Sequence, residues 1–378
     1  MIERTLFNQD HEYFRSVAHR FLKREVVPHH RRWEEQGYVD REIWKKAGDA
    51  GLLCPAIPEP YGSGVADVRF GVVVLEEQAR AGATGLGWAI HSEVVAPYIL
   101  DYGSDDQKSR YLPKMASGDL VAAIAMTESS GGSDLKTIRT SAIKEGDHYV
   151  LNGSKTFISN GWHCDLVLVA AKTDAKAGAK GISLFLVEAS SNGFKKGERL
   201  KKVGFNAQDT SELFFDNVRV PVRNRLGDEG QGFSFMMHHL SWERLMAAIA
   251  AIAGAESALE TTILYAKERK IFDRDLLSFQ NTRFTLAELK SEIQIGRVFV
   301  DRCVELSVEG KLDAATASMA KYWCTELHFK VLDACVQLHG GYGYMQEYQI
   351  ARSWADAGIQ RLAGGANELM KELIGRSL

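Results

Sequence analysis

The stretch "HYVLNGSKTFIS", residues 148–159, has two runs of strand-favouring residues around the dipeptide Asn152-Gly153. That dipeptide is typical of a tight β-hairpin, so we expect the turn of a hairpin at these two residues. Further short apolar runs follow, separated by turn residues: "DLVLVAAKT" (165–173), "ISLFLVEAS" (182–190) and "SELFFDNVRVP" (211–221). Short strands at this spacing predict a small antiparallel barrel or sandwich.

Helical periodicity precedes and follows these strands. In "YFRSVAHRFLKREVVP" (13–28), apolar residues from Phe14 to Leu22 recur at helical spacing, and Pro28 ends the run. After Gly230, four long helical stretches are expected, and their short connections favour an antiparallel bundle; they cover 231–269, 277–309, 312–339 and 346–375. We therefore predict an α+β multidomain protein with a helical domain at 1–120, a β domain at 121–228 and a helical bundle at 229–378.

Composition excludes several classes of protein. The 378 residues suffice for two or three domains at ~150 residues each, and the net charge of −3 offers no basic excess to nucleic acid or an anionic membrane. The five cysteines are dispersed without a C-x-x-C pair, so neither a metal site nor disulfides are expected. The longest apolar stretch, around 245–255, is shorter than the ~20 residues of a membrane span. Acidic residues near the start suit neither a signal nor a transit peptide, so we expect a cytoplasmic protein.

Two glycine-containing stretches are candidate ligand loops. In "AMTESSGGSD" (125–134), a tight turn at Gly131-Gly132 with nearby hydroxyl groups could hold a phosphate or the polar edge of a heterocycle. In "QLHGGYGYM" (337–345), three glycines at a helix-to-helix break could allow close approach of a ligand. A plain Ser/Gly turn and a simple helix stop are the alternatives. The phosphate-binding motifs G-x-x-x-x-G-K-[ST] and G-x-G-x-x-G are absent from the sequence.

A third stretch, "LSWERLMAAIAAIAGA" (240–255), has Glu243 near its start and few other charges. The residues on the same helical face are Ala247, Ala250 and Gly254, all of them small. A carboxylate above such a groove could face a flat apolar ligand, and desolvation would raise its pKa toward that of a general base. The alternative is a glutamate that complements the helix dipole or pairs with an arginine.

The three stretches together resemble the acyl-CoA dehydrogenase family along the whole chain. "LNGSKTFISNG" (151–161), "AQDTSELFFDNVRVP" (207–221) and "ERKIFDRDLLSFQ" (268–280) are similar to further family segments. The resemblance implies an N-terminal helical domain, a middle antiparallel β-barrel and a C-terminal four-helix bundle. It also implies FAD as the cofactor, a homotetramer, and α,β-dehydrogenation of a saturated acyl-CoA to the trans-2-enoyl-CoA, as in the β-oxidation of fatty acids. An electron-transferring flavoprotein would be the electron acceptor and partner.

The position of the catalytic base separates the types within the family. Most members have a glutamate in a C-terminal E-G-T segment, where "LAGGANELMKEL" (362–373) has Gly364. Long-chain and isovaleryl types have the catalytic glutamate on the first bundle helix, in a motif ending in E-R-L. Residues Glu243 to Leu245 match this motif. "MAKYW" (319–323) favours the long-chain type. A catalytically silent relative, a DNA-binding relative and an oxygen-using oxidase are the alternative functions.

Carried over by position, the resemblance assigns Glu243 as the catalytic base. It implies further contacts with FAD from residues of the flavin loops, of a neighbouring subunit and of the C-terminal segment: Met126, Thr127, Gly132, Ser133, Phe157, Ile158 and Ser159; Arg269, Phe272, Gln280, Gln337, Leu338, His339, Gly340 and Gly341; and Asn367 and Glu368. Substrate contacts are expected from Ser133, Ser241, Arg244, Gly364 and Gly365. The sequence departs from the common pattern at Ser129-Ser130, Phe157 and Ser241.

Overall fold

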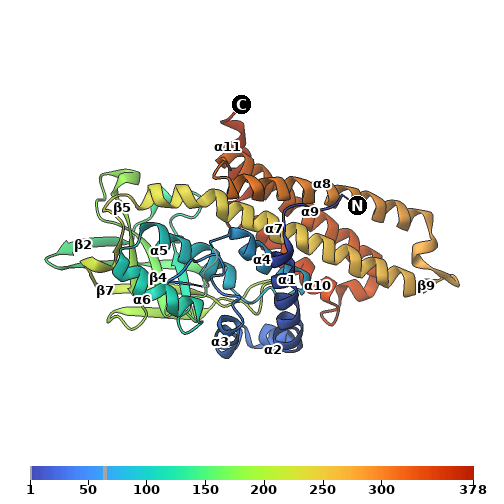
Figure 1. Cartoon of the computed structure of the whole chain (residues 1–378), viewed down its shortest axis with the longest axis horizontal. Coiled ribbons are helices and arrows are strands. Elements are labelled where there is room, and N and C mark those ends of the chain that lie inside the picture. Colours follow the sequence, from blue (N-terminus) through green and yellow to red (C-terminus); the bar gives the residue numbers. More distant parts are fainter. Residues whose placement is uncertain (1, 63–65) are drawn as a thin grey trace.

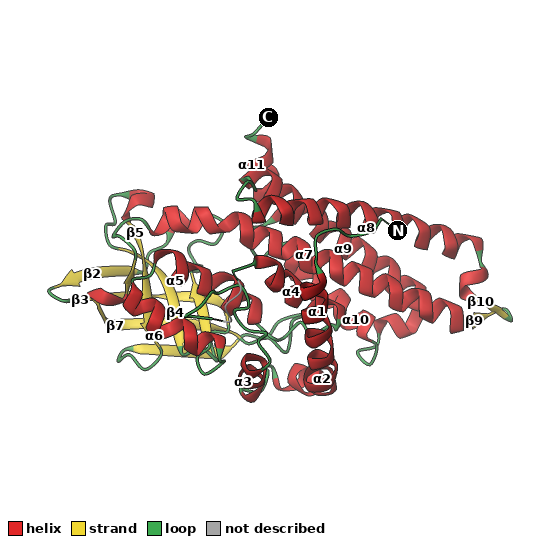
Figure 2. Cartoon of the chain, viewed as in Figure 1, coloured by secondary structure: helices red, strands yellow, loops and turns green. Residues whose placement is uncertain are grey.

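The structure is a computed structural model that describes residues 2–62 and 66–378. A β-sheet lies at one end of the elongated molecule and long helices extend to the other end (Figures 1 and 2). The N-terminal third is helical, as its periodicity predicts, and consists of α1 (Gln9–Phe21), η1 (Leu22–Val26), α2 (Val27–Gln36), α3 (Glu42–Asp49), α4 (Val68–Arg80), η2 (Ile90–Val95), α5 (Ala96–Tyr102) and α6 (Asp105–Ala116).

The middle of the chain forms one sheet, with β1 (Ala122–Ala125), β2 (Ser141–Glu145), β3 (His148–Ser159), β4 (Leu166–Lys172), β5 (Ile182–Glu188), β6 (Phe194–Arg199), β7 (Thr210–Pro221) and β8 (Arg225–Leu226). The strand order is β6-β7-β3-β2-β4-β5-β8, and β1 pairs with β4 in parallel. Most other pairs are antiparallel. Within the described residues the sheet is not closed, since β6 and β8 are its two ends. The barrel in our prediction is therefore not confirmed.

The hairpin turn predicted at Asn152-Gly153 is wrong. These residues lie inside the continuous strand β3, where the register with β7 shifts between Leu151 and Gly153. Gly153 has a φ of +149°, and a side chain there would lie 2.5 Å from the Thr140 hydroxyl oxygen. The glycine therefore serves a β-bulge, where an irregular backbone conformation is needed. The turn itself falls at Gly146, between Glu145 and its strand partner His148.

The C-terminal part contains α7 (Gly232–Glu268), α8 (Gln280–Val308), α9 (Ala314–His339), α10 (Gln349–Gln360) and α11 (Asn367–Gly375). A small hairpin of β9 (Lys270–Ile271) and β10 (Arg274–Asp275) connects α7 to α8. The single helix predicted at 346–375 is wrong, because it breaks at 361–366 into α10 and α11. The break contains Gly364 and Gly365, whose φ values of +67° and +92° are unsuited to a helix.

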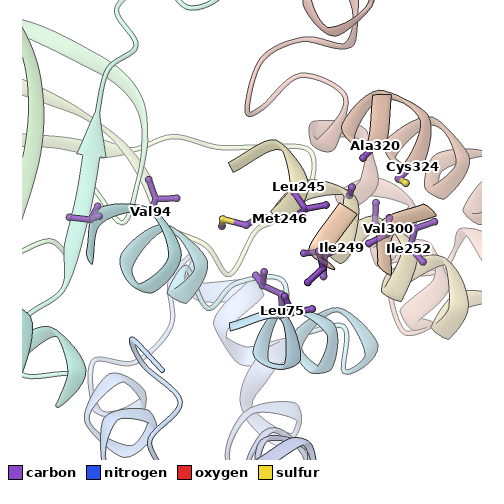
Figure 3. Close-up of a cluster of buried hydrophobic side chains, with 14 of the residues drawn as sticks. Leu75, Val94, Leu245, Met246, Ile249, Ile252, Val300, Ala320 and Cys324 are labelled. Carbon is purple, nitrogen blue, oxygen red and sulfur yellow. The ribbon is translucent and has the colours of Figure 1, made fainter. Parts of the chain in front are cut away.

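The largest core cluster joins the N-terminal helices to the bundle. Leu75 of α4 and Val94 of η2 lie on one side of α7, and Val300 of α8 and Ala320 of α9 lie on the other (Figure 3). A buried ion cluster adds to this contact, since Glu76 of α4 pairs with Arg4, Arg15 and Arg297 at N–O distances of 2.7–2.8 Å. The central helix α7 is thereby held on both sides.

Helix α7 is long and apolar enough to cross a membrane by length and composition alone. The mean hydropathy over its 18-residue window is 1.3, and half of that window is buried inside the fold. Leu245, Ile249 and Ile252 belong to the core shown in Figure 3. Core packing explains these apolar residues, and one such helix is weak evidence for a membrane span.

Candidate active site

Glu243 lies about three turns after the start of α7, and its side chain is only partly buried. Tyr98 of α5 is fully buried, and its hydroxyl group donates a hydrogen bond to Glu243 Oε1 over 3.2 Å. Burial raises the pKa of Glu243, while the nearby His239, the hydrogen bond from Tyr98 and the charge of Arg244 act in the opposite direction. The result is a carboxylate with raised proton affinity and one oriented oxygen, as a general base requires.

Aromatic rings form a wall beside this carboxylate. His239 lies one helical turn before Glu243 and stacks on Tyr98, with ring centroids 4.3 Å apart. His239 Nε2 is 3.2 Å from Asp101 Oδ2, and Phe235 stacks on Tyr102 at 3.8 Å. Sequence reasoning missed Tyr98, because "APYIL" has no motif and the contact depends on how α5 packs on α7.

Arg244 faces the interior between α7 and α9. Its side chain is buried, its Nη1 donates to Ser318 Oγ over 3.4 Å, and its Nε has no partner among the described residues. Burial lowers its pKa. Ser241 is partly buried one residue before Trp242. Arg244 is thus placed under the surface, where its unpaired Nε remains available to a buried acceptor.

The segment with Gly364 and Gly365 is fixed from α9. Lys321, fully buried, donates from Nζ to Gly365 O over 2.7 Å and to Asn367 Oδ1 over 2.8 Å. Asn367 in turn donates to Thr325 Oγ1 and to Glu326 Oε1. Ser318 and Lys321 are one helical turn apart, so α9 contacts both Arg244 and the glycine segment. Neither Lys321 nor its role was predicted from the sequence.

The same segment has free hydrogen-bond donors. In the described part of the chain, the N–H groups of Gly364, Gly365 and Ala366 have no acceptor. Consecutive backbone N–H groups near left-handed residues form a concavity suited to an oxyanion. Glu368, in the first turn of α11, lies on the exposed side of this segment.

The predicted flavin loop is held by an ion pair that the sequence did not reveal. Lys155 Nζ is 2.8 Å from Glu128 Oε1 and also donates to Met126 O. The Glu128 carboxylate accepts from the N–H groups of Arg139 and Thr140. Gly132 and Ser133 are exposed beyond this anchor, and Thr127 is partly exposed. The loop therefore presents its glycine and its hydroxyl groups outward on a fixed base.

Phe157 lies next to this loop in an unusual conformation. Its φ is +59° and its ring is 69% exposed, at the irregularity between Lys155 and Ile158. The neighbouring Thr156 N–H donates to Thr127 O, which joins the two segments, and Ile158 is buried while Ser159 is partly buried. Left-handed non-glycine residues concentrate at functional sites, and an exposed ring beside polar groups suits a flat heterocycle. These residues fit the isoalloxazine ring of FAD.

The predicted cofactor residues of the bundle, apart from Asn367 and Glu368, flank the β9–β10 hairpin or lie beside the end of α7 that leads into it. This hairpin is at the far end of the bundle (Figure 1). Arg269 follows α7, and its Cζ is 5.9 Å from the Tyr342 ring. Phe272 is 89% exposed with a φ of +48°, and a Cβ at Gly340 or Gly341 would meet no described atom within 4 Å. Gln280 and Gln337 are exposed, Leu338 is partly buried, and the buried His339 stacks on Tyr265 at 4.2 Å. The hairpin and the sheet are at opposite ends of the molecule (Figure 2).

Comparison with known proteins defines the class of this chain. Residues 8–119, 123–218 and 230–378 match the N-terminal, middle and C-terminal domains of acyl-CoA dehydrogenases, in that order. The chain belongs to the acyl-CoA dehydrogenase family of oxidoreductases, and the resemblance drawn from the motifs is confirmed.

Individual relatives agree over the full length. The chain is 48% identical over 377 residues to the mitochondrial long-chain specific acyl-CoA dehydrogenase of Sus scrofa, which covers 99% of this chain and 88% of that protein. The crystal structure of an acyl-CoA dehydrogenase from Geobacillus kaustophilus superposes with a TM-score of 0.97, 45% identity and 99% coverage of each chain. A glutaryl-CoA dehydrogenase from Mycobacterium smegmatis, solved in complex with FADH2, gives a TM-score of 0.91 at 28% identity, covering 98% of this chain and 95% of that one.

Proposed function

We propose that this protein is an FAD-dependent enzyme that dehydrogenates a saturated acyl-CoA thioester between its α- and β-carbons, giving the trans-2-enoyl-CoA. The observation that supports it most is Glu243, a partly buried carboxylate with a raised pKa that accepts a hydrogen bond from Tyr98. A silent relative would not need that arrangement. The net charge of −3 argues against a DNA-binding relative.

In this proposal Glu243 removes the α-proton of the bound thioester. The α-carbon is a weak acid, so a base with raised proton affinity is better matched to it than an ordinary carboxylate. Tyr98 occupies Oε1, which leaves Oε2 to accept the proton. The free N–H groups of the 364–366 segment bind the thioester oxygen as negative charge develops on it, and Lys321 keeps this segment in place.

Thr127, Ser133, Phe157 and Ser159 are the residues of the sheet domain that would hold the flavin, with Met126, Gly132 and Ile158 shaping their surroundings. When bound there, FAD would supply the acceptor for the hydride from the β-carbon. The residues near the β9–β10 hairpin would hold the ADP half of a neighbouring subunit's FAD. The separation of the two groups in one chain supports this division between subunits, and with it the homotetramer (Figure 1).

The physiological acceptor we propose is an electron-transferring flavoprotein, and the role is in fatty-acid oxidation. The similarity to a long-chain specific relative supports a long acyl chain. The cytoplasmic location of this protein stays a prediction from its sequence. The relative from Sus scrofa is named mitochondrial.

A panel of straight-chain and branched acyl-CoA thioesters tests this function. With FAD-replete protein and no oxygen present, a good substrate should bleach the flavin and give an enoyl-CoA product. An artificial electron acceptor should then support turnover, whereas hydrogen peroxide formed in air at the same rate would identify an oxidase instead. If no thioester bleaches the flavin, the proposed function is wrong.

A further inference from the structure

One face of α7 beyond Glu243 carries only small residues. The residues at successive turns on this face, from Ala247 through Ala250 and Gly254 to Ser257, are only partly buried, whereas most residues between them are buried. All of them are small, so they leave room beside the helix. Its far part borders a cavity of about 160 Å³ that also touches α4, residues 84–89, α9 and α10. An engineered protein cavity of similar size, about 150 Å³, binds benzene, so this one can hold the distal part of an acyl chain.

His328 of α9 lines this cavity with an unused hydrogen-bond acceptor. The side chain is only 7% exposed, and its Nδ1 is 2.8 Å from Gln360 Oε1. An amide oxygen can only accept, so this contact places the imidazole proton on Nδ1 and leaves a lone pair on Nε2. Burial lowers the pKa of His328 to about 4, which keeps the ring neutral at physiological pH. In the described structure Nε2 has no hydrogen-bond partner.

Gly254 makes room for this nitrogen beside α7. A Cβ at position 254 would lie only 2.6 Å from His328 Nε2. The imidazole edge therefore occupies the space above the glycine, on the face of α7 that begins with Glu243. The path from residue 243 to residue 254 along the helix is about 16 Å at 1.5 Å per residue. A ligand group at His328 would thus be far from the thioester.

The acidic side chain that lines this cavity is already paired. Asp356 accepts from Thr84 Oγ1 over 2.7 Å and from the Phe205 N–H group. Since Nε2 of His328 is a neutral acceptor, a carboxylate or ketone on the chain would gain no hydrogen bond from this nitrogen. A hydroxyl group can donate to it, and a buried acceptor left without a donor is costly.

We propose that the substrates include long-chain acyl-CoA thioesters with a hydroxyl group at the distal end of the chain, which donates a hydrogen bond to His328 Nε2. This inference rests on the proposed function, because the cavity beside His328 can receive an acyl chain only if Glu243 is the base that acts on the thioester. The recognition is by shape and one hydrogen bond, with no charge involved.

Two long-chain acyl-CoA thioesters of equal length, one with a terminal hydroxyl and one without, test the inference. The selectivity is the ratio of kcat/KM for the hydroxylated chain to that for the plain chain. His328→Phe should lower this ratio about fivefold, the effect of one neutral hydrogen bond, while the plain chain is still turned over. His328→Gln, which can still accept, should retain part of the selectivity. His30→Phe is the matched control, because His30 is similarly buried but lies on α2 away from the cavity, and it should leave the ratio unchanged.

A binding measurement separates this inference from the proposed function. The same two chains are prepared as CoA thioethers, which cannot react, and their affinities for the FAD-loaded protein are measured by calorimetry. The hydroxylated thioether should bind more tightly to the wild type, and His328→Phe should remove the difference. An equal ratio in the wild type and His328→Phe, in both assays, overturns the role of His328. Failure of both thioesters to react counts against the proposed function, and the thioether pair still decides the role of His328.

Discussion

Glu243 and Glu93 show how similar side chains take different roles according to their surroundings. Burial raises the pKa of both, but Glu243 is partly accessible and hydrogen-bonded to Tyr98. Glu93 is buried in η2, against the backbone of Gly71, where a Cβ would lie 2.4 Å from its carboxylate oxygen. Only the first can meet a substrate, so a raised pKa alone does not identify the base.

We expect Glu93→Gln to change how stability depends on pH. Burial raises the pKa of Glu93 from 4.5 to about 8, so between these values the folded chain keeps a proton that the unfolded chain loses. The wild type must therefore lose stability as pH rises through this window, and the neutral glutamine must not. The stability of the variant relative to the wild type should rise by up to a few kcal/mol from about pH 5 to about pH 8, at ~1.4 kcal/mol per pKa unit. Urea unfolding at both values measures this, and parallel pH profiles would show that Glu93 is ionised in the fold.

Gly364 allows the base to be moved to the position that most family members use. Its φ of +67° strains any other residue by about 1–2 kcal/mol, but a Cβ there meets no described atom within 4 Å. We expect Glu243→Gly with Gly364→Glu to have partial activity, above that of Glu243→Gly alone, and a shifted preference among acyl chains. Steady-state turnover of both variants on one acyl-CoA panel measures this. Equal background rates in folded, FAD-replete proteins would show that a carboxylate at residue 364 cannot reach the α-carbon of the substrate.

At the scale of the elements, sequence periodicity predicted the helix–sheet–helix order, and it located α7, α8 and α9 within a few residues. Two elements were misjudged for physical reasons. Asn152-Gly153 has the composition of a turn, but pairing of β3 with both β2 and β7 keeps the strand continuous through a bulge. The region 346–375 has a helical pattern throughout, but two left-handed glycines divide it.

The candidate site shows the same limit. Motifs pointed to Glu243, Phe157 and the two glycine loops, because these lie in short contiguous segments. Tyr98, Lys321 and His328 act through contacts between elements far apart in the chain, with hydrogen bonds from Tyr98 to Glu243 and from Lys321 to Gly365. Such partners are determined by packing, which spacing within one segment does not encode.

The contact of α9 with the glycine segment gives a prediction at this scale. Lys321→Met removes the buried ammonium that donates to Gly365 O and Asn367 Oδ1, and burial already lowers the pKa of this lysine to about 8. Leaving these acceptors unpaired should cost about 1–3 kcal/mol of unfolding free energy. The matched control on the same helix is Lys330→Met, which removes an exposed pair with Glu292 worth at most about 1 kcal/mol. Chemical denaturation that finds both variants equally stable would contradict the anchoring role of Lys321.

At the scale of the molecule, the predicted cofactor residues of the sheet lie far from those near the β9–β10 hairpin (Figure 1). Exposed aromatic residues accompany the distal group, with Phe272 89% and Tyr344 76% exposed. Exposed apolar side chains of this size are typical of interaction surfaces. We infer that this end of the bundle contacts a neighbouring subunit and completes its FAD site.

Arg269→Ala tests that inference. A charge-assisted contact with the pyrophosphate of FAD is worth about 1.5–3 kcal/mol, so the variant should lose FAD on dialysis and melt at a lower temperature. Arg274→Ala is the control on the same hairpin, because Arg274 is exposed and lies 4.9 Å from the Phe279 ring. Flavin absorbance after dialysis and the Tm with added FAD measure the effect. Full retention of FAD by Arg269→Ala would rule out a contact between Arg269 and the FAD of a neighbouring subunit.

The central claim is that Glu243 removes the α-proton, and Glu243→Gln tests it most directly. Glutamine keeps the size of the side chain and can still pair with Tyr98, but it cannot accept the proton. In anaerobic stopped-flow mixing with a good acyl-CoA substrate, we expect a folded, FAD-replete variant whose flavin bleaching is about 10²–10⁴-fold slower than in the wild type. Bleaching at a near-normal rate in that variant would contradict the account.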